Sequence, residues 1–262
     1  MAMKKTVVGM AFLVVFCLIQ VSLAHAIEAG VDVGTAYYRW WEFTTLGVIK
    51  EAGNIRTVGG HIAGVPLQKL PALKLRGNVL LFHGQVDYDT KTSLGTPVKT
   101  TSNYLGFKVE GNTGWCFVYE QTCIEPFLGL AYRIWERDID STSIVQGYPE
   151  LYSALYGKIG MRVDHKPQEG ITIYTAWSID PMLWARERID WTSISGETLV
   201  VNNGRRVGWT IEGGAHWNYF EALAYWQATR LGKSNEVSCS GIICFQPKSF
   251  QDVIGFKVGY LF

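Results

Sequence analysis

The sequence predicts an all-β chain that folds as an antiparallel transmembrane β-barrel of about ten strands. Segments with apolar residues at every second position recur along residues 27–262, and the last of them ends on the aromatic Phe262. No stretch after residue 26 approaches the about 20 apolar residues that a membrane helix needs. Because every backbone polar group must be paired inside a bilayer, a closed barrel is the remaining way for this chain to cross one.

The first 26 residues have the pattern of a secretory signal peptide. They combine a basic start at Lys4 and Lys5, an apolar run over residues 7–23 and an A-x-A cleavage site that ends at Ala26. A single transmembrane anchor is the alternative, but the run is short and no basic stop-transfer patch follows it. We therefore expect residues 1–26 to be removed on export and residues 27–262 to form one barrel domain.

Ten segments are predicted as strands, each by a weak alternation of the kind that barrel strands show. The clearest is the sixth, where Leu155 and Ile159 alternate with Tyr156 and Lys158. The third changes phase near Val79, which indicates a bulge. The predicted strands cover residues 27–43, 55–64, 73–88, 103–111, 123–138, 152–164, 171–188, 206–216, 219–230 and 250–262.

The connections between these strands differ in length in the way that outer-membrane barrels show. Long polar loops are expected at one end, which would be extracellular, and mostly short turns at the other, periplasmic end. The terminal strand, with Tyr260 and Phe262 on its apolar face, is predicted to be the recognition signal for the barrel-assembly machinery. The predicted surface loops are residues 44–54, 89–102, 139–151, 189–205 and 231–249.

A soluble β-sandwich or lipocalin-like barrel is the alternative fold. Abundant aromatic residues argue against it, because Trp and Tyr favour the two interfaces of a bilayer. We expect outer-membrane lipid and lipopolysaccharide as surroundings. The tryptophans predicted at strand ends are Trp40, Trp41, Trp135, Trp177, Trp184, Trp191, Trp209, Trp217 and Trp226.

Cysteine usage agrees with an oxidising compartment outside the cytoplasm. Cys17 belongs to the signal peptide, and Cys116, Cys123, Cys239 and Cys244 form two near pairs. Two local disulfides are predicted, Cys116–Cys123 in a periplasmic turn and Cys239–Cys244 in the last surface loop. A four-cysteine metal site is the rival interpretation, but the spacing within each pair fits it poorly.

Charged residues of both signs fall on the predicted inward face. A barrel of this size has an interior that side chains can fill, so we expect them to pair into a lumen network. Its predicted centre is Arg133, Lys158, Arg162, Asp180 and Glu212, and the inward set also contains His83, Gln85, Arg137 and Arg186.

The signal peptide, the strand number, the long loops and the terminal aromatic residue resemble the omptin and Opc-adhesin group of outer-membrane barrels. Omptins are proteases, and this resemblance implies a site at the extracellular rim made of an Asp pair facing an Asp-His pair. Asp87 and Asp89 are similar in place to the Asp pair. The facing Asp-His pair is missing, and Arg186-Glu187-Arg188-Ile189-Asp190 stands near that position.

Catalytic candidates are therefore weak. His83 is the histidine nearest to Asp87 in the predicted strand and could act as a base, but a lumen histidine held in a polar network is the more ordinary interpretation. Asp138 and Asp140 could hold calcium at a loop tip, although short acidic tips are usually only solvated. The sequence predicts no cofactor and no metal site, and its net charge of +1 gives no indication of nucleic-acid binding.

Three functions remain open at this stage. The first is a structural or adhesin-like surface barrel whose long loops meet an extracellular ligand, since loops on a rigid scaffold commonly carry function. The second is an omptin-like protease, and the third is a small selective, porin-like channel. The missing catalytic set favours the first.

Overall fold

The computed structural model describes residues 27–45, 47–92, 94–192, 196–239 and 242–262. The predicted signal peptide, residues 1–26, lies outside these. Among the described residues, no helix is long and apolar enough to cross a membrane.

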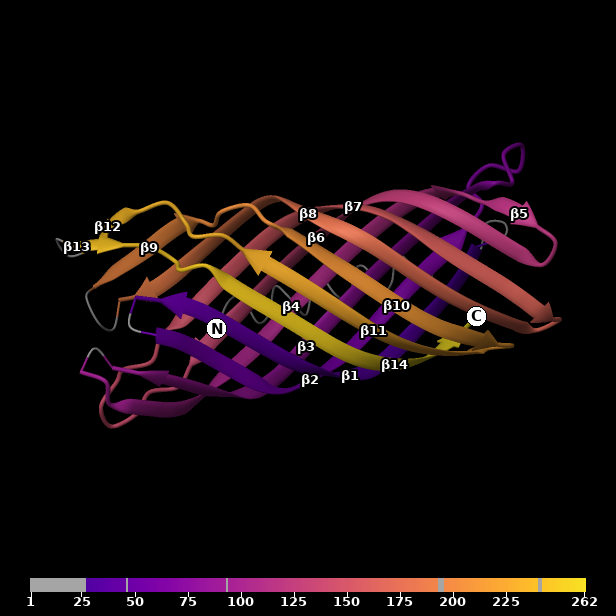
Figure 1. Cartoon of the computed structure of the whole chain (residues 1–262). Coiled ribbons are helices and arrows are strands. Elements are labelled where there is room, and N and C mark those ends of the chain that lie inside the picture. Colours follow the sequence, from indigo (N-terminus) through magenta and orange to yellow (C-terminus); the bar gives the residue numbers. More distant parts are fainter. Residues whose placement is uncertain (1–26, 46, 93, 193–195, 240–241) are drawn as a thin grey trace.

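Ten long antiparallel strands of the described chain pair side by side and close into a barrel (Figure 1). Each pairs with the next in the ring, β14 pairs with β1, and β8 closes the ring on β10. The predicted ten-stranded antiparallel barrel is thereby confirmed. The barrel strands are β1 (Ile27–Thr44), β2 (Gly47–Gly64), β3 (Leu73–Lys91), β4 (Pro97–Trp115), β6 (Thr122–Ile139), β7 (Pro149–Gln168), β8 (Ile171–Trp191), β10 (Val207–Trp217), β11 (Phe220–Leu231) and β14 (Ser249–Leu261).

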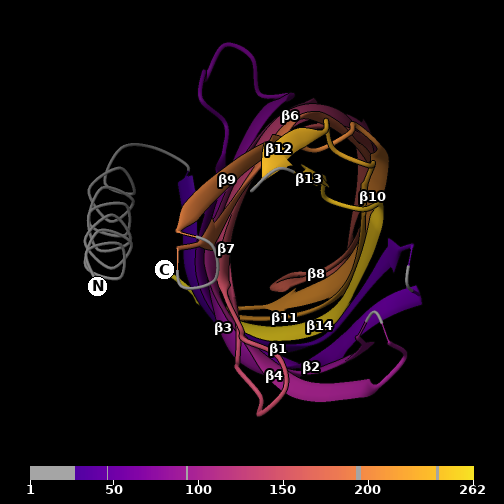
Figure 2. The ribbon, with the colours of Figure 1, turned by 90° about the vertical axis from the view of Figure 1, so that its left-hand side faces the viewer.

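Four short strands of the described chain lie outside the ring. β5 (Phe117–Tyr119) extends the edge of β6, and β9 (Glu197–Asn202) pairs with the end of β8. β12 (Val237–Cys239) and β13 (Ile242–Cys244) form a small hairpin between β11 and β14. Figure 2 looks down the barrel from the end that carries this hairpin.

The two ends of the barrel differ. We call the end that carries the described residues of 92–96, 140–148, 192–206 and 232–248 the loop end. The end with residues 65–72, 116–121, 169–170 and 218–219 is the turn end. One predicted loop, 44–54, is wrong, because β1 and β2 meet in a tight turn and residues 47–54 are strand. Polar side chains lie on the outer face of these residues, so the apolar alternation that marks a strand fades there.

Side chains alternate between the outer wall and the lumen, and the apolar ones lie on the outer wall, opposite to the arrangement in a soluble protein. On β14, Ile254, Phe256 and Val258 are exposed outward, while Lys257 is buried inside the ring. Such an exterior suits lipid, because charged side chains are costly there and apolar ones are not. At the level of this band, charged side chains such as Lys257 therefore lie in the lumen.

Aromatic residues border this apolar exterior. At the turn end Trp115, Trp217 and Phe220 are exposed, and toward the loop end Trp184 and Trp209 are exposed. Rings with a polar tip favour the two interfaces of a bilayer. Two of the predicted interface tryptophans, Trp40 and Trp135, are wrong, because both are fully buried inside the barrel.

Beyond the aromatic border, toward the loop end, the outer face becomes charged. Lys50, Asp87, Glu136 and Arg188 are outward neighbours of buried residues on four different strands. This part of the wall therefore stands in water rather than in lipid.

A bulge in the pairing of β7 with β8 determines which residues of the loop-end half of β8 face the lumen. Leu155 pairs with Trp184 and Tyr156 with Met182, so Leu183 is an extra residue. Leu183 and Trp184 consequently both face outward. The prediction that Arg186 faces the lumen is wrong for this reason, because after the bulge Arg186 is outward and its neighbour Glu187 is buried.

The bulge predicted near Val79 in the third strand is also wrong. β3 pairs with β4 from Leu73 to Lys91 without a register shift. Leu80 and Phe82 therefore face the lumen although they are apolar, and the alternation continues past them. Apolar residues on both faces of the strand produced the false signal of a phase change.

Candidate functional site in the barrel lumen

An aromatic plug fills the lumen in its loop-end half. Tyr38, Trp40, Tyr104, Trp135 and Tyr152 come from β1, β4, β6 and β7, and all are almost completely buried. Trp135 stacks on Tyr152 with ring centroids 4.8 Å apart, and Trp40 meets Tyr152 edge-on at 5.6 Å. Aromatic pairs in these geometries stabilise a core beyond the area that they bury. We call these five residues the aromatic plug.

A cluster of glutamates surrounds one arginine next to the plug. Arg137 of β6 is buried and donates from Nε to Glu51 at 3.0 Å and from Nη1 to Glu150 at 2.6 Å. Its Nη1 also lies 3.5 Å from Glu42. Glu187 of β8 completes what we call the glutamate cluster, which is Glu42, Glu51, Glu150 and Glu187.

The glutamate cluster lies beyond the lipid-facing band. Glu51, Arg137 and Glu187 have the outward neighbours Lys50, Glu136 and Arg188, which belong to the charged part of the wall. Burial raises the pKa of Glu42 to about 7, and it raises the pKa of Glu187 well above its usual range with help from the charge of Glu150.

Hydroxyl donors satisfy part of the cluster. Ser102 donates to Glu51 at 2.8 Å, Tyr104 also donates to Glu51, and Tyr152 donates to Glu150 at 3.0 Å. These three hydroxyl groups thus donate hydrogen bonds to two of the four carboxylates.

Residues 232–239 and 242–248, which we call the cap, pack over the loop end. Cys239 is buried against Ile189 and Leu199, and Trp191 lies against the same group. Gln246 is buried as well. Plug, cluster and cap together leave the loop-end half of the lumen filled by side chains.

The turn-end half of the lumen contains cavities between paired charges. A cavity of about 80 Å³ is lined by Tyr38, Phe82 and Arg133 below the plug, and one of about 100 Å³ lies nearer the turn end beside His61 and Glu221. A third, of about 420 Å³, is the mouth at the turn end. The lumen is therefore hollow on one side of the plug.

All five residues predicted as the centre of the lumen network face inward. Lys158 binds Glu110 at 2.5 Å, and Arg162 binds Asp164 at 2.8 Å. The remaining three do not join one network: Arg133 bonds Gln251 and stacks on Phe82 and Trp135, Asp180 accepts from Ser178 and Thr210, and Glu212 lies 3.9 Å from Arg162.

Two histidines lie among carboxylates near the turn end. His216 contacts Glu221 at 3.0 Å and Glu28 at 3.4 Å, and His61 lies 3.6 Å from the other oxygen of Glu221. Tyr174 donates to Glu221 at 2.5 Å. These contacts pair the groups with one another, which is the ordinary way to bury charge.

The three weak catalytic candidates face away from the lumen. Asp87 and Asp89 alternate with the buried Val86 and Tyr88, and both are exposed on the outer wall. The prediction that His83 and Gln85 face inward is wrong, since both follow the outward phase of β3. Nδ1 of His83 lies 3.1 Å from the carbonyl of Tyr104, whereas Gln85 bonds Asn103. No cleft of the described chain brings the three candidates together.

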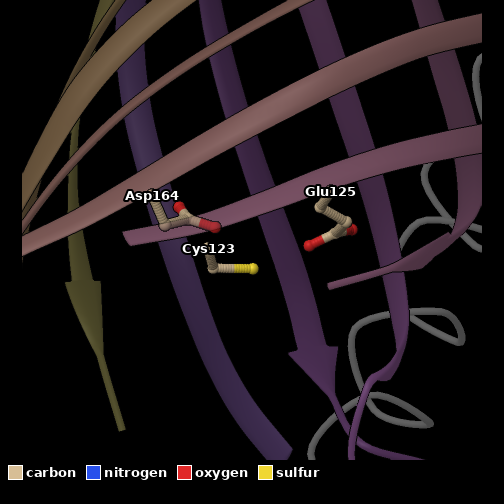
Figure 3. Close-up of side chains that lie close together, drawn as sticks. All are labelled: Cys123, Glu125 and Asp164. Atoms are coloured by element: carbon tan, nitrogen blue, oxygen red, sulfur yellow. The ribbon is translucent and has the colours of Figure 1, made fainter. Parts of the chain in front are cut away.

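A metal-like group of side chains lies at the turn-end mouth (Figure 3). Ligand atoms of Cys123, Glu125 and Asp164 lie within 4.8 Å of one another. The Cys123 sulfur, however, is bonded to Cys116, so it is no thiolate. Arg76 binds both carboxylates, at 2.7 Å to Glu125 and 3.4 Å to Asp164. Arg162 also binds Asp164, at 2.8 Å, so two guanidinium groups balance the two carboxylates.

The other cysteine pair, Cys239 and Cys244, is bonded across the β12–β13 hairpin.

The carboxylate of Asp140, the candidate calcium ligand at a loop tip, accepts hydrogen bonds from Thr101 and from Asn103. Tyr260 and Phe262, the predicted assembly signal, both lie exposed on the outer wall.

Sequence reasoning missed the four glutamates of the cluster. Glu51 and Glu150 stand just before the predicted second and sixth strands, and Glu187 was given the outward phase. Extending the period of two by a few residues beyond the apolar stretch would have placed Glu51 and Glu150 inside.

The inverted exterior and the closed ring define the class of the protein as a ten-stranded transmembrane β-barrel. Among solved structures, the outer-membrane protease OmpT of Escherichia coli is similar with a TM-score of 0.58 and 6% sequence identity, over 91% of this chain and 97% of that chain. The architectural resemblance to omptins is thereby confirmed for the fold. At this identity the likeness extends to the fold alone.

Two further barrels are more distant. The translocator domain of the autotransporter NalP of Neisseria meningitidis matches with a TM-score of 0.47 and 13% identity, over 98% of this chain and 97% of that one. The attachment invasion locus protein Ail of Yersinia pestis matches with a TM-score of 0.36 and 10% identity, over 90% and 99%. No protein-family model matches the sequence, and no curated protein matches it.

Proposed function

We propose that the protein is a surface barrel of a Gram-negative outer membrane, with its loop end outside the cell, that serves as a structural or interaction protein. The filled loop-end half of the lumen carries this proposal. A solute that entered at the turn end would meet the aromatic plug, then the glutamate cluster and then the cap. Such an interior does not favour the free passage of solutes through the barrel.

The loop tips support an interaction role. Leu94, Ile144 and Ile243 lie in three different segments of the loop end and are largely exposed, with Leu94 at 92%. Apolar side chains that gather into a patch on a water-facing surface mark interaction sites, and we take these three tips as parts of one such surface. The partner would be an extracellular ligand that offers apolar surface.

The protease alternative lacks support in the geometry. An omptin-like site needs an Asp pair and an Asp-His pair on facing walls of one cleft. Here Asp87 and Asp89 lie outside the wall, and the segment of β8 where the resemblance implied the facing pair carries the buried Glu187 between two outward arginines. A base within reach of a water and a substrate is the first requirement of such chemistry.

Conductance of the refolded protein in a planar bilayer tests the proposal. We expect the wild type to insert without stable channels and Trp135→Ala to conduct, because it removes one of the two largest rings of the plug. Trp177→Ala, which changes a lipid-facing tryptophan, is the matched control. Steady wild-type channels would contradict the proposal and promote the channel hypothesis.

Assembly is a separate part of the proposal. Deletion of Phe262 should lower the yield of folded barrel in cells, with little effect on refolding in detergent, if the terminal strand is read by the assembly machinery. Equal yields with and without Phe262 would remove that role.

A further inference from the structure

Arg133 of β6 is a buried base without an acid. The residue is 6% exposed, and its guanidinium donates to Gln251 and lies over the rings of Phe82 and Trp135, 4.8 and 4.5 Å from their centroids. No carboxylate of the described chain forms an ion pair with it. Ring faces attract the flat faces of a guanidinium but leave most of the five N–H donors at its edge without acceptors. A buried cation normally has a counter-charge, and this one lacks it.

The lysines around Arg133 already have their acids. Lys158 and Lys108 share Glu110, at 2.5 and 2.7 Å, and Lys257 binds Asp32 at 3.1 Å. These contacts leave neither carboxylate for Arg133.

The two other acids of this part of the lumen are also occupied. Each carboxylate oxygen of Asp180 accepts a hydrogen bond from a hydroxyl group, and Glu212 lies 3.9 Å from Arg162. The missing counter-charge of Arg133 is therefore not supplied by the described part of the chain.

Arg133 lines the cavity of about 80 Å³ below the aromatic plug. Tyr225 of β11 lines it too, lies close enough to Arg133 for its hydroxyl to interact with that charge, and has no hydrogen-bond partner for this hydroxyl among the described residues. Much of the remaining wall is aliphatic. Its apolar side chains are those of Ala36, Ile55, Leu80, Leu223 and Val253.

We propose that this cavity binds a small monocarboxylate, with its carboxylate at Arg133 and Tyr225 and a short aliphatic chain against the apolar wall. A guanidinium matches a carboxylate with two parallel hydrogen bonds, and the ligand would bring the missing negative charge. A cavity of about 80 Å³ holds about five to eight water molecules at ~10–15 Å³ each, which is the size of a carboxylate with a few carbons.

The cavity is connected to the turn end. It shares Leu223 and Lys257 with the cavity of about 100 Å³, and that cavity shares Arg76 and His216 with the mouth. The aromatic plug closes the other side. The site is therefore a dead end that a ligand enters and leaves through the mouth, and it requires no passage through the barrel.

Saturation-transfer NMR with butyrate alone, at neutral pH, tests the site on the refolded chain in deuterated detergent. We expect the aliphatic protons of butyrate to receive saturation from the wild type. The affinity should be about tenfold lower or less in Arg133→Gln, because a hydrogen bond to a charged group is lost. Arg186→Gln, which changes an outward arginine, is the matched control and should bind like the wild type.

A neutral analogue and thermal unfolding give two further readouts. Butyramide has the shape of butyrate without its charge and should bind the wild type much more weakly. Butyrate should raise the melting temperature of the wild type and of Arg186→Gln but not of Arg133→Gln, since a ligand that binds only the folded state stabilises it. Should Arg133→Gln fail to refold, Tyr225→Phe, which removes one hydroxyl, and Ala36→Leu, which fills part of the cavity, replace it with weaker binding expected.

Four outcomes overturn the site. The wild type binds no butyrate, the cavity variants bind it like the wild type, or Arg186→Gln loses binding as well. If butyramide binds as tightly as butyrate, the apolar wall rather than Arg133 holds the ligand. If chloride or phosphate raises the melting temperature through Arg133 and butyrate does not, the counter-charge is an inorganic anion and the carboxylate assignment is wrong.

Discussion

The two halves of the lumen use the same alternation of side chains but balance charge differently. Near the turn end one acid is held by two bases, since Glu110 binds Lys158 and Lys108, and Asp164 binds Arg162 and Arg76, with cavities between these groups. Near the loop end one base, Arg137, serves several acids in a packed interior. The turn half should therefore tolerate the loss of a single partner, and the loop half should not.

Replacing Arg137, the base shared by the glutamate cluster, should cause the largest loss of stability. Arg137→Ala leaves the glutamate cluster without its cation, and loss of one partner from a buried ion pair costs about 3–5 kcal/mol. Urea unfolding in detergent, followed by tryptophan fluorescence, measures the loss. Arg188→Ala, on the outer wall of β8, is the control and should change stability little. Equal effects of the two changes would mean that the cluster does not depend on Arg137.

The two disulfides, one at the turn end and one at the loop end, allow the stability of the two ends of the barrel to be compared. Their cysteines are 7 and 5 residues apart, so each bridge should contribute about 2–3 kcal/mol at most by the chain-entropy relation. The double variants Cys116→Ser/Cys123→Ser and Cys239→Ser/Cys244→Ser should thus unfold at similar urea concentrations. A much larger loss at the loop end would show that the buried Cys239 anchors the cap by packing.

Removing a base from the turn half should cost less. In Lys158→Met the carboxylate of Glu110 keeps Lys108 at 2.7 Å, so only part of its pairing is lost. We expect about 1–2 kcal/mol, in the range of hydrogen bonds to charged groups. The same urea titration measures it, with the exposed Lys166→Met as control. A loss as large as that of Arg137→Ala would remove the difference between the halves.

Changes on the outer wall of β3 should have the smallest effect. His83→Ala and Asp87→Ala alter exposed side chains, and such substitutions usually change stability by less than about 0.5 kcal/mol. We expect little or no cleavage of peptides with paired basic residues, assayed with lipopolysaccharide present, and neither substitution should change this. Robust cleavage that either substitution abolishes would restore the protease hypothesis.

The sequence was sufficient for the fold because a barrel in lipid must alternate on every strand. The positions of Ile159 and Lys158 on β7, or of Trp209 and Thr210 on β10, follow from that period alone. The period of two is clearest where the outer face of a strand is apolar. It is lost where the outer face is in contact with water.

The loop-end half of the lumen was harder to predict for three physical reasons. Glu51 lies on a stretch of β2 whose outer face is polar, so no apolar signal marks the strand there. Leu183 adds one residue to β8 and exchanges the facing of Arg186 and Glu187. Leu80 and Phe82 are apolar residues on the inner face of β3, which obscured the phase that puts His83 outside.

Most neighbours in the ring are also close neighbours along the chain, but β1 and β14 are not. A hairpin closes a short loop, whereas the contact of Gly30 with Leu261 joins positions near opposite ends of the sequence. We therefore expect this β1–β14 contact, the seam of the barrel, to form last in folding. Until it forms, the sheet exposes two unpaired edges that can pair with other chains. Assembly should thus be sensitive to crowding of nascent chains, while the finished barrel is not.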